Sequence, residues 1–183
     1  MTLKPLHDPS HLFFETATIL GWRQLFSNEE YARIVLDALV WHRSNRRWEL
    51  FAYVLMPNHL HAVIKPLEPQ TISTVLQSFG SFTAHAILEQ LRSDRQEDLL
   101  AFFSQRHQRD TGKGHQIWQP IQAKNVYSAE FLREKVEYTH NNPVADRWRL
   151  VETRADYAYS SACYYDRDEM SRVEVDDVRE WMV

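Results

Sequence analysis

The chain has 183 residues, of which 44% are hydrophobic, so it can enclose one substantial core and is expected to fold as a single domain over residues 1–183. One cysteine excludes an intramolecular disulfide, and the lack of an apolar run of about 20 residues predicts a cytoplasmic protein without a membrane-spanning helix. A formal net charge of −4 excludes an overall basic footprint for nucleic acid.

The acidic excess is concentrated at the C-terminus. Residues 166–183 hold seven acidic and three basic side chains, which gives this tail a net charge of −4 and leaves the rest of the chain balanced. A cationic face elsewhere is therefore permitted. We expect the tail to be a solvated end beyond a domain core of about residues 12–165; a tail that shields a DNA-binding groove is the alternative hypothesis.

The first two expected elements are a strand and a helix. Residues 12–20 are rich in aromatic and β-branched side chains, which is typical of a strand. Ser27 and Glu30 have the spacing of a capping box, and apolar residues recur at helical intervals after them. This pattern predicts a helix over about residues 28–43.

A buried strand pair is expected next. Residues 48–56 are apolar on both alternating faces, as in a strand at the centre of a sheet. Pro57 and Asn58 supply turn chemistry, and residues 59–65 resume an extended alternation.

The remaining pattern predicts helices on either side of one more strand. Thr71 is expected to cap a helix with a single apolar stripe. Residues 92–115 lose this periodicity and are expected to form a mobile excursion. Residues 117–124 predict a strand that contains a proline, hence an edge or a bulge, and residues 128–140 predict a helix. The order of elements predicts an α+β fold with one antiparallel sheet and helices packed on it.

His59 and His61 form a His-x-His pair on an expected strand. Side chains on a strand alternate between its two faces, so both imidazoles project from the same face and can chelate one cation. The chain has nine histidines, and two of them at this spacing also fit the polar face of an ordinary strand.

Tyr138 and Asn142 lie four residues apart at the end of the last expected helix. This spacing puts the phenol and the amide on one side, although Pro143 biases the backbone of Asn142 away from the helical region. Either residue alone fits ordinary packing or a helix stop. With the histidine pair they fit a tyrosine nucleophile, because a divalent cation on two imidazoles and an amide oxygen would polarise a phosphodiester for attack. The product, a phosphotyrosine ester, would conserve the bond energy for a second transfer.

Three stretches together resemble one known family. They are Tyr53-Val-Leu-Met-Pro-Asn-His-Leu-His-Ala-Val-Ile64, Val136-Glu-Tyr-Thr-His-Asn-Asn-Pro-Val144 and Tyr157-Ala-Tyr-Ser-Ser-Ala162. In these stretches the chain resembles the Y1 transposases of the IS200-like group of HUH endonucleases, and especially the REP-associated tyrosine transposases. The similarity runs from about residue 12 to residue 165.

The resemblance implies a ferredoxin-like antiparallel sheet with helices on one face and, on the other, a metal site beneath a C-terminal helix that carries the tyrosine. It implies that Tyr138 is the nucleophile and that His59, His61 and Asn142 hold Mg²⁺ or Mn²⁺. The implied activity is that of a transposase, which cleaves and rejoins single-stranded DNA through a 5′-phosphotyrosine intermediate.

The implied partner is single-stranded DNA that contains a hairpin, from REP or BIME-like repeats or from insertion-sequence ends. The protein is expected to be nucleoid-associated and to act as a monomer or a homodimer. Cationic side chains would track the phosphates while bases stack on exposed aromatic rings. The candidates for phosphate contacts are Lys65, Arg106, Arg109, Lys113 and Lys124.

Some features depart from the family pattern and leave alternatives open. Residues 145–147 replace the family's usual Arg-Ala-Gly, and Tyr159 stands where tryptophan is common. Residues 119–124 lack the sequence that is usual in the family. The alternatives are a catalytically silent hairpin-binding protein, a replication initiator or relaxase of the HUH class, and a zinc hydrolase, for which Asn142 would be an unsuitable ligand. The histidines expected to be structural or on the surface are His42, His85, His107, His115 and His140.

Overall fold

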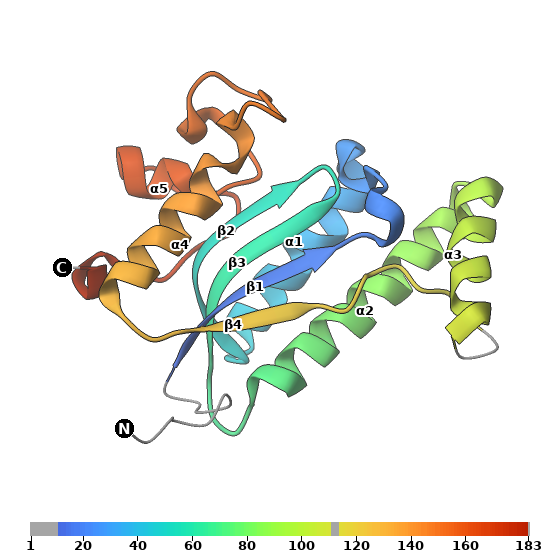
Figure 1. Cartoon of the computed structure of the whole chain (residues 1–183), viewed down its shortest axis with the longest axis horizontal. Helices are drawn as coiled ribbons and strands as arrows, with labels where there is room; N and C mark the ends of the chain where they lie inside the picture. Colours follow the sequence, from blue (N-terminus) through green and yellow to red (C-terminus); the bar gives the residue numbers. More distant parts are fainter. Residues whose placement is uncertain (1–10, 111–113, 183) are drawn as a thin grey trace.

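The computed structural model describes residues 11–110 and 114–182. The strands and longer helices are β1 (Leu12–Thr18), α1 (Glu29–Ser44), β2 (Trp48–Met56), β3 (His59–Pro66), α2 (Ile72–Ser93), α3 (Glu97–Asp110), β4 (Gln122–Val126), α4 (Ala129–Asn141) and α5 (Ala162–Arg167) (Figure 1). Short 3₁₀ turns lie at Leu20–Trp22, Leu25–Ser27, Asn142–Val144, Arg154–Asp156 and Arg179–Met182. Among the described residues, no helix has the length and apolar character needed to cross a membrane.

The four strands form one antiparallel sheet in the order β2-β3-β1-β4. With α1 between β1 and β2, and α2 and α3 between β3 and β4, this is the strand order of a ferredoxin-like β-α-β-β-α-β unit. The expected α+β fold is confirmed. The final strand is an edge strand, as its proline-containing sequence predicted, but it begins at Gln122 because residue Trp118 makes only an isolated bridge to Ile19.

The sheet lies between two helical layers. Helices α1 and α2 cover one face, and α4 lies over β2 and β3 on the other (Figure 1). The alternation of β3 serves both layers: Leu60 and Ile64 enter the larger core with α1 and α2, whereas Val63 enters a smaller core beside Leu132 and Val136 of α4. The tyrosine-bearing helix therefore lies over the histidine strand, as the resemblance implied.

Two local predictions need correction. The N-cap of α1 is Asn28, whose side-chain oxygen accepts from the backbone N–H of Glu30, rather than Ser27. Residues 92–115 are not an excursion without structure: most of them form α3, in which Phe103 is fully buried. The predicted helix cap at Thr71 is confirmed, with Thr74 completing a capping box.

The acidic tail packs on the edge of β2 and is not a solvated end. Where the burial of the tail is described, its buried residues are three valines that lie between the acidic side chains: Val173, Val175 and Val178. The Asp176 carboxylate accepts hydrogen bonds from the backbone N–H of Leu50 at 3.0 Å and from Arg43 at 2.9 Å. The valines carry the tail into both cores, and their burial is the physical reason why the expectation fails.

One acidic side chain lies inside the larger core. Glu15 on β1 lies on the same face of the strand as Phe13 and Ala17, because every second side chain points the same way. It therefore faces the α1–α2 layer. It is completely buried, and neither carboxyl oxygen has a hydrogen-bond partner among the described residues. Burial raises the pKa of the Glu15 carboxyl from its usual 4.5 to about 8.

We predict that Glu15→Gln removes a pH-dependent loss of stability. The folded state holds the Glu15 proton to a higher pH than the unfolded state, so this contribution is complete below about pH 4.5 and is lost as the pH rises through about 8. Urea unfolding of both proteins at several pH values measures it. As the pH rises through this window, the free energy of unfolding of the wild type should fall relative to that of the variant by about 1.4 kcal/mol per pH unit. A constant difference between the two proteins would show that Glu15 does not titrate there.

Candidate active site

Strand β3 presents His59 and His61 to the side of the sheet that α4 covers. Their ring centroids lie 4.7 Å apart, and both side chains are about 95% buried, with relative exposures of 4% and 5%. In the sheet, His61 stands opposite Thr16 on β1 and Val54 on β2. The structure thus brings the two imidazoles together on one face, as the strand alternation predicted.

Neighbouring oxygens orient both imidazoles. The Nδ1 atom of His59 lies 2.6 Å from the side-chain oxygen of Asn58, and Nδ1 of His61 lies 3.0 Å from the hydroxyl of Thr16. Burial lowers the pKa of His59 to about 4, helped by the nearby Arg147 charge, and burial with the charge of its histidine neighbour lowers the pKa of His61 to about 3. Both rings are therefore neutral near pH 7, which is the form that binds metal ions.

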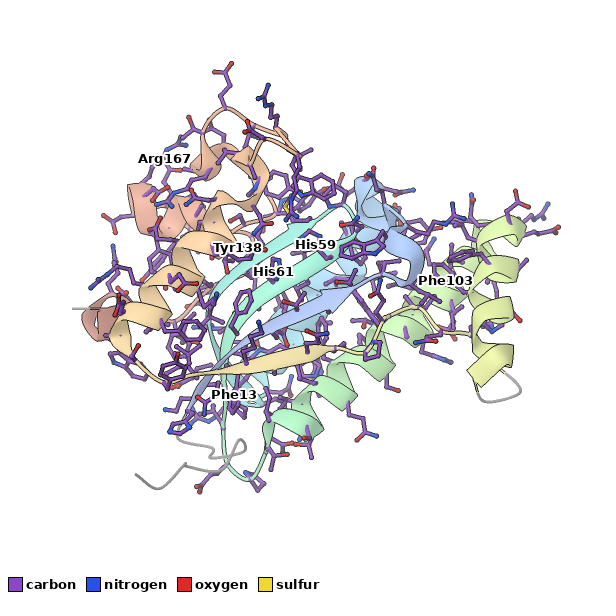
Figure 2. The ribbon with its side chains drawn as sticks, in the orientation of Figure 1. Phe13, His59, His61, Phe103, Tyr138 and Arg167 are labelled. Carbon is purple, nitrogen blue, oxygen red and sulfur yellow. The ribbon has the colours of Figure 1, made fainter. Side chains whose placement is uncertain are left out.

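Tyr138 reaches the histidine pair from α4. Its ring centroid lies 5.2 Å from that of His61 and 5.9 Å from that of Phe14, both in edge-on contact. The side chain is 43% exposed, so the phenol is accessible from solvent. Figure 2 shows the labelled Tyr138, His59 and His61 side chains gathered where α4 passes over β3.

Asn142 continues the turn of α4 and is buried. Its backbone has helical angles (φ −54°, ψ −46°), so the bias expected from Pro143 does not take effect. The side-chain NH₂ donates to the carbonyl of Tyr138 at 2.8 Å, and the amide oxygen accepts from Arg147 at 3.3 Å. Interaction with the same side chain partly offsets the lowering of the His59 pKa. Phenol, amide and imidazoles therefore meet at one place.

Tyr138, His59 and His61 border a cavity of about 400 Å³, whereas Asn142 lines an adjoining pocket that shares Tyr138 and Arg147 with it. Among the described residues its lining includes three cationic side chains and no acidic one. The cavity is lined by Phe14, Thr16, Thr18, Trp22, His59, His61, Gln122, Lys124, Lys135, Tyr138 and Arg147. A concave site with this balance favours an anionic ligand.

The structure separates the predicted DNA-contacting residues. Lys124 lines the cavity, whereas Lys65 lies outside it, 3.4 Å from Glu49 at the other end of the strand. The side chains of Arg106 and Arg109, and the whole of Lys113, fall outside the part of the chain that the structure describes.

Lys135, Arg147 and Trp22 are among the cavity residues that the sequence did not identify. Lys135 stands three residues before Tyr138 on one helix, a spacing that could have identified it. Its ammonium lies 5.7 Å from the centroid of the Tyr138 ring and 5.4 Å from that of Phe14. Trp22 lies in a short turn and Arg147 lies in the irregular segment after α4. Neither position belongs to a repeating pattern that the sequence could reveal.

Three of the remaining histidines have structural or surface roles. His140 is fully buried, and its Nε2 lies 2.9 Å from the Ser161 hydroxyl, away from the cavity lining. His42 is buried against the Ala38 carbonyl, and His85 is exposed. The side chain of His107 lies outside the described part of the chain.

Arg154 ties the end of α4 to the segment that follows it. Its guanidinium donates to the carboxylates of Glu137 and Asp166 and to the side-chain oxygen of Asn141. Glu137 and Asn141 immediately precede Tyr138 and Asn142 in the chain. This forked contact therefore helps to hold Tyr138 and Asn142 in place.

The comparisons with known proteins concern the fold. No protein-family model matches the chain, and no curated protein matches it. A solved structure of a REP-associated tyrosine transposase bound to a REP hairpin matches 97% of this chain and 93% of its own length, with 19% identity and a TM-score of 0.64. A putative transposase from Deinococcus radiodurans R1 matches 75% of this chain and 94% of its own length, with 16% identity and a TM-score of 0.45. The chain thus shares the fold of the first of these structures.

We predict that Arg154→Lys destabilises the protein by about 1 to 3 kcal/mol, because an ammonium cannot reproduce a forked guanidinium contact with two carboxylates. Urea unfolding measures the loss. The matched control is Arg149→Lys, whose pair with Asp146 is exposed and should contribute little. Equal effects of the two substitutions would contradict a special role for Arg154.

Proposed function

We propose that this protein is a transposase that cleaves and rejoins hairpin-containing single-stranded DNA, with Tyr138 as nucleophile and a divalent cation held by His59, His61 and Asn142. The observation that supports this most is the convergence of the phenol and the paired imidazoles in one cationic cavity, with the Asn142 amide hydrogen-bonded to the Tyr138 carbonyl and to the cavity residue Arg147. The fold shared with a transposase that binds a REP hairpin supports the choice of DNA.

The side chains fit a divalent cation. Both imidazoles are neutral near pH 7 and are oriented through Nδ1, as is usual for metal-binding histidines. The amide oxygen of Asn142 has two lone pairs, so it can accept the long contact from Arg147 and still face a cation. Mg²⁺ or Mn²⁺ would complete its coordination with oxygens of phosphate and water.

In the proposed reaction the phenolic oxygen of Tyr138 attacks the scissile phosphorus. A bond forms between phosphorus and the tyrosine oxygen, and the bond from phosphorus to the 3′ oxygen breaks. The phenolic proton passes to solvent, and the departing 3′ oxygen takes up a proton. A bound Mg²⁺ or Mn²⁺ would polarise the phosphate and offset its developing charge. A 3′ hydroxyl of another strand can reverse the transfer without nucleotide hydrolysis.

The cavity cations have a separate role in this proposal. Lys135 approaches Tyr138 from the preceding turn of α4, Lys124 comes from β4, and Arg147 lies beside Asn142. They would hold the phosphates on either side of the scissile bond, since cation–phosphate contacts supply much of the affinity for nucleic acid.

Two alternatives are less well supported. A catalytic zinc site normally has three protein ligands drawn from histidine, cysteine and carboxylate. No group of three such side chains gathers among the described residues. A silent DNA-binding module would not need an accessible phenol beside neutral imidazoles.

The first test is covalent capture of DNA by Tyr138. Wild-type protein, incubated with Mg²⁺ or Mn²⁺ and labelled single-stranded hairpin DNA from its own genomic flanks, should form an adduct that survives denaturing electrophoresis. Tyr138→Phe should form none and still bind, and a chelator should suppress the wild-type adduct. Tight binding by the wild type without an adduct would leave only the silent binding module.

We further propose that the tyrosine acts within its own chain, because Tyr138 already contacts His61 of the same chain. Mixing Tyr138→Phe with His61→Ala tests this. Two inactive variants should remain inactive together, whereas recovery of the adduct would indicate exchange of the α4 helix between subunits.

We predict that Lys135→Met weakens binding of single-stranded DNA and lowers the slope of log affinity against log salt by about 0.7 to 1, the value for one lost phosphate contact. Anisotropy titrations over a range of salt concentrations measure it, in the Tyr138→Phe background. Lys65→Met is the comparison, because each lysine is paired with one glutamate, Lys135 with Glu134 and Lys65 with Glu49, but only Lys135 lines the cavity. The assignment fails if both substitutions change the slope equally.

A further inference from the structure

Trp22 is a large aromatic residue that lines the cavity and remains mostly open to solvent. Its exposed fraction is 61%, whereas the chain buries other tryptophans such as Trp48 and Trp118. It stands at the end of the Leu20–Trp22 turn, between β1 and α1. An exposed indole beside a catalytic cavity contributes little to the core and is available to a ligand.

The backbone at this position is in a conformation that tryptophan rarely adopts. Trp22 has a φ of 58° and follows Gly21, whose φ is 66°. A bulky residue in the left-handed region carries strain. Neither local propensity nor burial therefore explains why tryptophan stands here.

Contacts from three elements hold this turn. The Trp22 backbone N–H donates to Ile19, and the Trp22 carbonyl accepts from the side chain of Asn58 at 3.3 Å. A side chain at Gly21 would come within 2.6 Å of Phe102 on α3, so the turn packs tightly against that helix. The surrounding structure thus fixes the backbone from which the indole projects.

The same asparagine connects the turn to the histidine pair. While its NH₂ donates to Trp22, the side-chain oxygen of Asn58 lies 2.6 Å from Nδ1 of His59. The Trp22 backbone is therefore linked through one side chain to a proposed metal ligand. A ligand group on Trp22 would lie at a defined place relative to the reacting phosphate.

We infer that Trp22 is a stacking platform for one unpaired base next to the scissile phosphate. This inference rests on the proposed function and adds the way in which the strand is positioned. A free base offers a flat face to an aromatic ring, whereas a paired and stacked base in a duplex does not. The cavity cations hold phosphates in this scheme, and the indole holds the adjacent base.

The test uses binding and cleavage of one probe, a labelled hairpin oligonucleotide with single-stranded flanks, taken from the genomic flanks of the gene. Affinities are measured in the Tyr138→Phe background, and adduct formation is measured with active protein. The variants are Trp22→Asn, which tolerates a positive φ, and Trp22→Tyr, which keeps a stacking ring. Phe82→Ala, which removes an exposed ring on α2, is the matched control.

We expect Trp22→Asn to weaken binding by roughly 5- to 100-fold, the usual range for loss of one stacked base, while thermal stability is kept. Trp22→Tyr should retain most of the affinity, and Phe82→Ala should bind like the parent protein. A set of probes with a single abasic site identifies the base: at one flank position its removal should weaken the parent protein but not Trp22→Asn.

The outcomes separate the two proposals. If the wild type forms the adduct and Trp22→Asn binds as tightly as its parent, or if no abasic position distinguishes them, the stacking inference is wrong and the transposase proposal stands. If the wild type neither binds the probe nor forms an adduct, the proposed function is wrong and the inference falls with it.

Discussion

The burial of β3 between two helical layers is the constraint on which the rest of the structure depends. Leu60, Ala62 and Ile64 point into the core under α1 and α2, so a slip of one residue would replace them with polar imidazoles. The same register places His59 and His61 beneath α4. Their burial there lowers their pKa values, and neutral imidazoles are the form that a metal site needs. Packing and chemistry are thus set by one alternation of side chains.

The sequence was most informative where local rules act alone. The central hairpin and the Thr71 cap could be predicted because turn chemistry, strand alternation and capping all operate within a few residues. Helix α3 was missed because its apolar residues occupy only its first half, Leu99 to Phe103, and the polar half that follows continues no apolar stripe. The tail was misjudged because its charge is conspicuous, whereas Val173 and Val178 act only through contacts with distant elements.

The site residues likewise divide into those that local spacing revealed and those that depend on contacts between distant segments. His59, His61, Tyr138 and Asn142 were identified from their spacing together with the family resemblance, and the structure gathers them. Their roles as ligands and nucleophile remain predictions. Cavity residues on irregular turns had no comparable signal. Trp22 reaches the cavity only because α3 and the β2–β3 turn hold the chain before α1, and no pattern within a short window encodes contacts between those segments.

The formal charge of −4 does not conflict with binding of a polyanion, because the acidic residues of the tail are largely paired. Arg43 meets Asp176, Arg179 meets Asp168 and Asp177, and no described residue of the tail lines the cavity. At physiological salt, exposed charges are screened beyond about 8 Å, so an approaching phosphate responds mainly to the side chains nearest to it. Those side chains are cationic. The electrostatic character of the site is therefore local, and the net charge of the chain is a poor guide to its partner.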